Sequence, residues 1–116
     1  MNRREYGARG ETLALAYLQK RGYALVAKNY RALRCEVDLI LRDGETLVFA
    51  EVKARASSAY GLGREAVTPA KQRNIIKAAE VYLASHGLAE ACVRFDVLEV
   101  DLVTGFVTHI PGAFTL

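Results

Sequence analysis

Four charged side chains interrupt two apolar runs in the middle of the sequence. The stretch EVDLILRDGETLVFAEVKAR, residues 36–55, carries Glu36 and Asp38 in its first run and Glu51 and Lys53 in its second. Carboxylates on neighbouring strands are the ligand type that Mg²⁺ takes in proteins, where one or two of them bind the ion together with water and phosphate oxygens. A lysine beside such a pair is suited to position an attacking water and stabilise charge developing on phosphorus. The chemistry indicated is phosphodiester hydrolysis.

The two runs are predicted to form a β-hairpin, because Asp-Gly between β-prone residues is a strong hairpin signal. Side chains alternate between the two faces of a strand, so we expect all four charged groups on one face, near the end away from the turn. Two registers are open. A two-residue Asp-Gly turn pairs Glu36 with Glu51, whereas a four-residue turn over residues 43–46 pairs Asp38 with Glu51 and Glu36 with Lys53.

Crowded carboxylates on paired strands require a compensating positive charge. Directly opposed side chains have Cβ atoms about 4.5–5.5 Å apart, and like charges at that range destabilise a sheet. A divalent cation, Mg²⁺ or Mn²⁺, held by Asp38 and Glu51 is one solution. The other is an ion-pair cluster on an open sheet face, in which Lys53 pairs with Glu51 or Glu36. The residue types alone leave both open.

The elements that must position these residues follow from local signals. Apolar spacing and the stop signal of Gly22 predict a first helix, and Thr68 followed by Pro69 predicts the N-terminus of a second. The expected elements in chain order are a helix over 3–21, strands over 23–30, 36–42 and 47–53, a loop over 56–67, a helix over 68–86, and strands over 91–101 and 106–110. The order α, β, β, β, α, β, β predicts an α/β (α+β) fold, a mixed sheet with helices packed on it.

Length and composition favour one domain over residues 1–116. The chain has 116 residues, 52% of them hydrophobic and 25% charged, which suits a single core. Its apolar runs reach only about six residues, far short of the roughly 20 that span a bilayer, and the first residues lack the apolar stretch of a signal peptide. We therefore expect a cytoplasmic protein that does not enter membranes, with Cys35 and Cys92 as reduced thiols.

Positive charge is concentrated in the first part of the chain. Residues 1–77 contain 15 Lys and Arg against 8 Asp and Glu, whereas residues 78–116 contain 1 against 5, which together give the net charge of +3. A positive surface of this kind attracts a polyanion. An ordinary solvated surface with scattered cations is the alternative.

The motif also carries a family resemblance. An acid, a turn and then Glu-Val-Lys on the next strand, here Asp38 with residues 51–53, resembles the core motif of the PD-(D/E)XK nuclease superfamily, and the helix-first order is similar to its compact Holliday-junction-resolvase-like members. The sequence resembles more closely the YraN-like family of small, functionally uncharacterised bacterial proteins. This resemblance runs through GETLALAYLQKRGYALVAKNY, CEVDLI, FAEVKAR and the helix of Lys71, from residue 7 to about residue 100.

The resemblance implies a restriction-endonuclease-like fold and a role for each matching residue. Asp38 and Glu51 would be the ligands of Mg²⁺ or Mn²⁺, and Lys53 the catalytic lysine. Glu11 matches an acid on the first helix that assists the metal, often through water, although from its position alone it reads as a solvated charge. Glu36 matches the acid of the family's Gly-Glu-Ile-Asp motif. These five residues are the expected catalytic set.

The implied activity is a metal-dependent DNA endonuclease that cuts branched or structured DNA, with a homodimer as a possible assembly. The alternative is a non-catalytic nucleic-acid- or protein-binding module with a nuclease-like fold. Arg55, Lys71 and Lys77 are the expected phosphate contacts, and a solvated helix face is the alternative for the two lysines. The sequence departs from the family pattern at Cys35, where Gly is usual, and at Ala54, where Thr is usual. Both positions neighbour the expected site.

Overall fold

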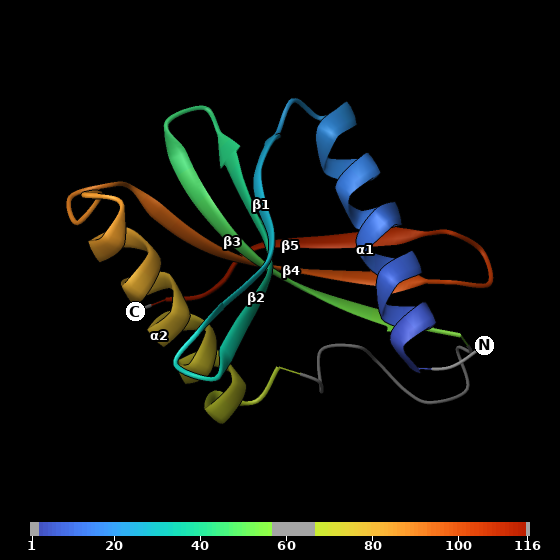
Figure 1. Ribbon diagram of the computed structural model, residues 1–116. Helices are drawn as coiled ribbons and strands as arrows, with labels where there is room; N and C mark the ends of the chain where they lie inside the picture. Colours follow the sequence, from blue (N-terminus) through green and yellow to red (C-terminus); the bar gives the residue numbers. More distant parts are fainter. Residues whose placement is uncertain (1–2, 57–66, 116) are drawn as a thin grey trace.

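The structure, a computed structural model, describes residues 3–56 and 67–115 and places two helices against a five-stranded mixed sheet (Figure 1). The elements in chain order are α1 (Arg3–Lys20), β1 (Ala24–Ala32), β2 (Cys35–Asp43), β3 (Thr46–Arg55), α2 (Pro69–Ser85), β4 (Val93–Asp101) and β5 (Val107–Phe114). This is the expected order, and it is consistent with a restriction-endonuclease-like fold. Most of the loop expected over residues 56–67 lies outside the described residues.

The strands lie in the sheet in the order in which they occur in the chain, from β1 to β5. Neighbouring strands are antiparallel except β3 and β4, which are parallel. A parallel pair cannot be joined by a tight turn, and α2 lies in the connection between these two strands. The first three strands therefore form an antiparallel meander that carries the acidic motif. The crossover through α2 then leads to the antiparallel pair of β4 and β5.

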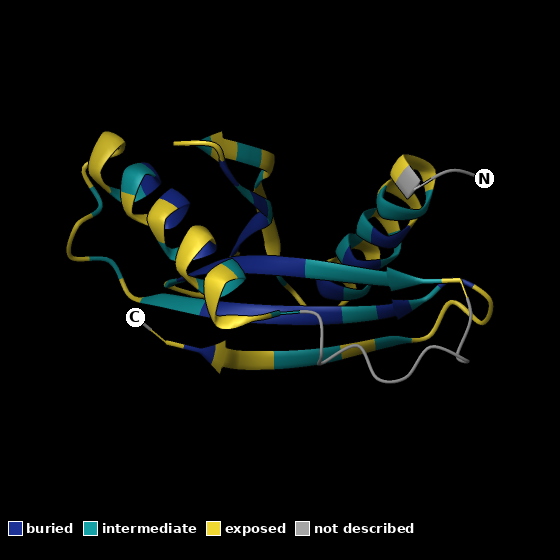
Figure 2. Ribbon diagram, turned by 90° about the horizontal axis from the view of Figure 1, so that it is seen from below, coloured by how far each residue is buried: buried dark blue, intermediate teal, exposed yellow. Residues whose placement is uncertain are grey.

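Alternating side chains of the strands feed two separate cores, one under each helix. Figure 1 shows α1 and α2 on opposite sides of the strands, and Figure 2 shows buried residues along the middle of the strands and the inner sides of the helices. The α2-side core includes Val37, Leu47, Phe49, Ile75, Tyr82 and Phe95. The α1-side core includes Ala14, Leu18, Leu39, Val48, Ala50 and Leu98. The sheet is thus covered on both faces, which fixes the strands that carry the charged residues.

A glycine brings α1 unusually close to β3. A Cβ atom added to the buried Gly10 would lie 2.6 Å from the Cβ of Ala54, a distance at which one of the two must shift. The small side chains at both positions therefore allow the helix to lie directly on the strand. This contact sets the position of the next helical residue, Glu11.

The N-terminus of α2 follows the expected signals. The Oγ1 atom of Thr68 accepts a hydrogen bond from the backbone N–H of Lys71 at 3.2 Å, and Pro69 occupies the first turn, where its missing N–H is tolerated. The helix ends before Gly87, whose φ is 65°. Neither α1 nor α2, the helices of the described residues, is long and apolar enough to cross a membrane.

The hairpin adopts one of the two expected registers. The β2–β3 ladder pairs Asp43 with Thr46 and continues to Leu39 and Ala50, which is the register of the four-residue turn. The last strand is longer than the expected 106–110 segment and continues beyond Pro111. Proline lacks an N–H to donate to a ladder, but β5 is an edge strand, so this position tolerates it.

The buried Asp96 of β4 links this strand to β5 and, through Arg94, to the end of β2. Asp96 is 0% exposed and accepts hydrogen bonds from Nε of Arg94 at 2.8 Å and from the backbone N–H of Gly112 at 3.0 Å. Nε2 of His109 lies 2.7 Å from its other oxygen. Burial alone raises the pKa of Asp96, but the hydrogen bonds from Arg94, Gly112 and His109 outweigh burial and lower it. Arg94 also pairs with Asp43 at 3.0 Å, which anchors β2.

Candidate active site

The site forms where β2 and β3 separate. Followed away from the turn, their backbone ladder ends at the pair Leu39–Ala50. The next residue of each strand is an acid, Asp38 in β2 and Glu51 in β3. Beyond this pair the Asp38 side chain takes over the role of the ladder, because its Oδ2 atom accepts a hydrogen bond from the backbone N–H of Val52 at 2.8 Å. A carboxylate that spans the gap between two strands is held in one orientation. Asp38 is thereby fixed beside Glu51, the residue of β3 that follows the last ladder pair.

Asp38 and Glu51 form an acidic pair in which Glu51 is buried and Asp38 is half-buried. Glu51 is 4% exposed. Burial and then the neighbouring carboxyl of Glu51 raise the pKa of Asp38 from an ordinary value of 3.8 to about 8, against the opposing effects of the Val52 N–H and Lys71. Two ionised carboxylates in such contact repel each other, so Asp38 keeps its proton at neutral pH unless positive charge beyond that of Lys71 reaches the pair. The pair therefore favours either a proton or a positively charged ligand.

The cation beside this pair comes from α2. Nζ of Lys71 lies 3.3 Å from Oε2 of Glu51. It is not aligned to donate a hydrogen bond, so this buried oxygen has no hydrogen-bond partner within the described residues. A buried carboxylate oxygen without a donor is costly, and it is the kind of atom that a metal ion satisfies. The ammonium of Lys71 thus offsets the charge in part without saturating the oxygen.

Glu11 and Glu36 approach the pair from the α1 side. In the orientation that satisfies both polar atoms of the Asn29 amide, its NH₂ group donates to Oε1 of Glu11 at 3.1 Å and to Oε1 of Glu36 at 3.2 Å. Burial, followed by the charges of Asp38 and Glu36, raises the pKa of Glu11. Glu36 also forms an ion pair with Arg31 at 3.1 Å on the exposed side. The first helix therefore contributes an acid to the rim of the site.

The expectation that all four charged groups share one face is wrong. Val37 belongs to the α2-side core and Leu39 to the α1-side core, although strict alternation would place both on the same side. The alternation of β2 breaks at Asp38, where the strands part. Glu36 consequently joins Glu11 on the α1 side, whereas Glu51 points toward α2.

Lys53 lies two residues beyond Glu51 on β3, and its cross-strand neighbour is another acid. The parallel ladder pairs Lys53 with Glu99 of β4, so the two side chains leave the sheet on the same face. Oε2 of Glu99 is buried and has no hydrogen-bond partner within the described residues. Lys53 forms no ion pair in the parts of the chain that the structure describes. Glu99 is therefore a further acid next to the site.

Sequence reasoning missed the role of Lys71 beside Glu51 and the whole contribution of Glu99. Lys71 was expected to contact phosphate, and its ion pair with an acid of the hairpin depends on how α2 folds back over the sheet. Glu99 left a weak signal, because it interrupts the apolar strand run VLEV. Arg55 is half-buried at the end of β3, and Lys77 is exposed on α2. Their expected contacts with phosphate stay predictions.

The chemistry of the donors fits a hard divalent cation. Asp38 retains one carboxylate oxygen that Val52 does not occupy, and Glu51 offers the oxygen that lacks a hydrogen-bond donor. Within the described residues, no group of three or more His, Cys, Asp or Glu side chains is arranged to hold a metal ion. The fit therefore rests on two carboxylates, which is the number that Mg²⁺ commonly takes from protein, with water and phosphate oxygens completing its shell.

Fold and site together define the class of this protein: a mixed α/β domain with a restriction-endonuclease-like architecture and an acidic pair where two central strands part. A family model described as "Uncharacterised protein family UPF0102" matches residues 10–100. The chain belongs to this family, as the resemblance to YraN-like proteins predicted.

Curated relatives agree with this assignment along nearly the whole chain. The UPF0102 protein of Geobacter metallireducens is 42% identical, with 100% of this chain and 97% of the relative aligned. That of Anaeromyxobacter dehalogenans is 45% identical, over 97% of this chain and 85% of the relative. That of Chlorobium chlorochromatii is 47% identical, over 95% of this chain and 91% of the relative. The names of these three proteins state no activity.

Proposed function

We propose that this protein is a divalent-metal-dependent endonuclease that hydrolyses phosphodiester bonds in DNA, with branched or otherwise structured DNA as the substrate class. The observation that carries the proposal is the contact between the carboxyls of Asp38 and Glu51. Burial and mutual repulsion raise the pKa of Asp38 to about 8, and an oxygen of Glu51 lacks a donor. A doubly charged ion removes both costs at once.

Each acid has a distinct task in this proposal. Asp38 and Glu51 would hold Mg²⁺ or Mn²⁺, with Asp38 oriented by the N–H of Val52 at 2.8 Å. When bound, the ion supplies Lewis acidity toward a phosphoryl oxygen and lowers the pKa of water. Glu11, held by Asn29, is placed to accept hydrogen bonds from water at the rim of the site. Glu36 shares this amide and supports Glu11.

The lysines would act on the phosphate. Lys71 lies 3.3 Å from an oxygen of Glu51, so its ammonium is already at the site and can turn to a phosphate oxygen once another cation neutralises the acid. Lys53 lies on the same strand as Glu51, and we assign it the attacking water and the charge that develops on phosphorus. Water adds to phosphorus as the bond to the leaving sugar oxygen breaks, and that oxygen takes up a proton. Arg55 and Lys77 extend the positive surface along the DNA.

A cleavage assay with matched variants tests the proposal. The purified chain is incubated with Mg²⁺ or Mn²⁺ and with synthetic four-way junctions, flaps, linear duplexes and RNA counterparts. Cutting of at least one substrate is expected, and Asp38→Asn, Glu51→Gln and Lys53→Ala should each abolish it while far-UV circular dichroism stays unchanged. Glu45→Gln, at an exposed acid of the hairpin turn, is the matched control and should cut normally. Absence of cutting by the parent chain on every substrate refutes the proposal.

A binding module without turnover is the second candidate, and the Lys71–Glu51 ion pair is the observation that favours it. A lysine at 3.3 Å supplies positive charge to the acids without any metal. In this case DNA binding persists in the Asp38→Asn and Glu51→Gln variants, no substrate is cut, and Lys71→Met destabilises the fold because it leaves a buried carboxylate uncompensated.

A further inference from the structure

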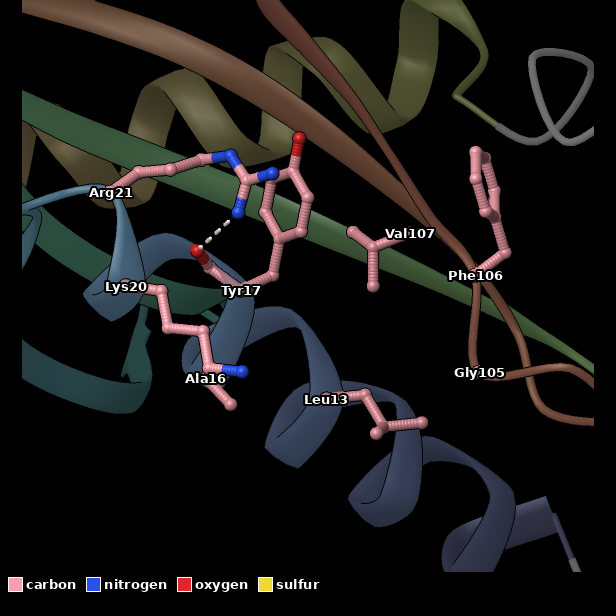
Figure 3. A pocket seen from close by; sticks show the side chains of 8 residues that line it. All are labelled: Leu13, Ala16, Tyr17, Lys20, Arg21, Gly105, Phe106 and Val107. Carbon is pink, nitrogen blue, oxygen red and sulfur yellow. Dashed lines mark hydrogen bonds between the residues drawn. The ribbon is translucent and has the colours of Figure 1, made fainter.

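We propose that a groove between α1 and the start of β5 binds an unpaired nucleotide of a single-stranded nucleic acid. The groove has a volume of about 460 Å³, within the range of small-molecule sites. Figure 3 shows Tyr17 of α1 and Val107 of β5 on facing walls, with Phe106 projecting from the turn that precedes β5. Below, these residues with Leu13, Lys20 and Arg21 are called the α1–β5 groove.

This groove is separate from the acidic pair. Leu13, Tyr17 and Lys20 follow one another at helical spacing on one face of α1, because 3.6 residues make a turn. By the same geometry Glu11, which contacts the site through Asn29, lies on the opposite side of the helix. Occupation of the groove can therefore be measured whether or not the protein cuts DNA.

The charges of the groove select an anion. Among the described residues that line it are two cations, Lys20 and Arg21, and no acid. The guanidinium of Arg21 lies 3.4 Å from the centroid of the Tyr17 ring, and its Nη1 donates to the backbone oxygen of Tyr17 at 3.1 Å (Figure 3). Stacking fixes the plane of the guanidinium and leaves other N–H groups to donate. A planar, oriented fork of donors beside an ammonium is well suited to phosphate.

The remaining surface of the groove selects a flat apolar group. Phe106 is 69% exposed and lines the groove. Leu13 and Val107 continue the apolar surface below it. Exposed aromatic rings of this kind are stacking platforms for bases in proteins that bind single strands, because every base has a π-face. A base against Phe106 with its phosphate at Lys20 and Arg21 uses both halves of the groove.

Charge complementarity favours a nucleic acid over a second copy of the chain. The protein carries a net charge of +3, so another copy offers no general attraction to a cationic groove, whereas a polynucleotide does. The end of α1 at Lys20 attracts cations by itself, since the C-terminus of a helix carries partial negative charge. The test must therefore separate ligand binding from a helix-end role of the two cations.

Fluorescence anisotropy separates these two roles. The full chain is titrated into a 5′-labelled dT₈ oligonucleotide, in EDTA to prevent cleavage. Phe106→Ala should weaken binding about tenfold, the expected loss of one stacked base. Val103→Ala is the matched control, because Val103 is 72% exposed in the same turn and does not line the groove. It should bind like the parent.

Salt dependence tests the two cations. The double variant Lys20→Gln with Arg21→Gln should reduce the slope of log K against log salt by about 1.4, because each phosphate contact of a single strand contributes about 0.7. The double variant Arg42→Gln with Arg73→Gln removes the same charge at exposed positions outside the groove and should keep the slope.

Three results overturn the proposal. The first is a parent chain that does not bind dT₈. The second is that Phe106→Ala and Val103→Ala bind dT₈ with equal affinity and that the double variant of Lys20 and Arg21 keeps the salt slope of the parent. In that case the two cations only stabilise the end of the helix. The third is a dimer in sedimentation velocity that Phe106→Ala dissociates without any change in dT₈ affinity, which makes the groove a protein interface. None of these results depends on cleavage, so the proposed nuclease function is judged separately.

Discussion

Replacing Asp38 with asparagine should stabilise the metal-free protein at neutral and alkaline pH. Burial and the carboxyl of Glu51 raise the pKa of Asp38 from 3.8 to about 8. Asparagine keeps an oxygen that can accept the Val52 N–H, which lies 2.8 Å from the native carboxylate. The substitution therefore removes a charge that the fold tolerates poorly and retains the hydrogen bond that bridges the strands.

The sign and size of this effect follow from proton linkage. Between about pH 4 and pH 8 Asp38 keeps its proton in the folded chain and loses it in the unfolded chain. The stabilisation that protonated Asp38 provides is complete below about pH 4. The free energy of unfolding then falls as the pH rises from about 4 to about 8, by at most about 1.4 kcal/mol per pH unit. Asparagine offers the Val52 N–H a neutral acceptor in place of a charged one, which offsets part of the gain. We expect Asp38→Asn to be more stable than the parent by about 1–3 kcal/mol at pH 8 and by less than about 0.5 kcal/mol at pH 4.5.

Urea unfolding followed by far-UV circular dichroism at several pH values, in EDTA, measures this difference. The chain has no tryptophan, which makes circular dichroism the more direct probe. Asp101→Asn is the control, because its Oδ1 atom also accepts a backbone N–H at 2.8 Å, from Val103, but in an exposed turn without a second acid. If Asp38→Asn is no more stable than the parent at pH 8, the acids do not repel one another and the reasoning fails.

Three further predictions, the first with a matched control, test the packing and the charges of the fold. Gly10→Ala adds a methyl group 2.6 Å from a β-carbon of β3 and should destabilise the fold by about 1–3 kcal/mol in urea unfolding, whereas Gly7→Ala, with nothing within 4 Å, should stabilise α1; equal effects contradict the close approach. Glu99→Gln removes the carboxylate across the ladder from Lys53 and should slow single-turnover cleavage about tenfold without loss of stability, and an unchanged rate would give Glu99 no part in the site. Asp96→Asn should cost about 1.5–3 kcal/mol in urea unfolding, because it weakens the hydrogen bonds that the buried carboxylate accepts from Arg94 and shares with His109, and a loss below about 0.5 kcal/mol would be inconsistent with that network.

Local signals account for the elements that the sequence predicted correctly. The start of α2 depends on Thr68 and Pro69 and the end of α1 on Gly22, all of which act within one turn of the chain. The register of the hairpin was narrowed to two choices, because a short turn permits few ladders. Choosing between them required the packing of both faces of the sheet, which no local signal contains.

The acids were found from their types and spacing, but their arrangement depended on an irregularity. Strict alternation assumes that a ladder continues along the whole strand. Here β2 pairs with β3 only from Leu39 to the turn. On the other side of β2, Asn29 of β1 lies opposite Asp38 and has a φ of 51°, a left-handed conformation that regular strands do not contain. Glu36 and Glu51 therefore face different helices although the sequence placed them together.

Contacts between distant elements were the hardest to predict. Lys71 reaches Glu51 only because α2 returns over the sheet after β3, and the sequence shows the lysine but not its reach. Asp96 and His109 are 13 residues apart and meet because β4 and β5 are antiparallel neighbours. Both contacts depend on tertiary pairing that spacing along the chain does not reveal.

The most direct test of the account is a crystal of the protein soaked in Mn²⁺ and measured at the manganese absorption edge. We predict an anomalous peak between the carboxylates of Asp38 and Glu51, with Lys71 displaced from its position 3.3 Å from Glu51. Clear density for both acids without such a peak, and with the lysine still in place, would contradict the claim that these strands gather acids to hold a divalent ion.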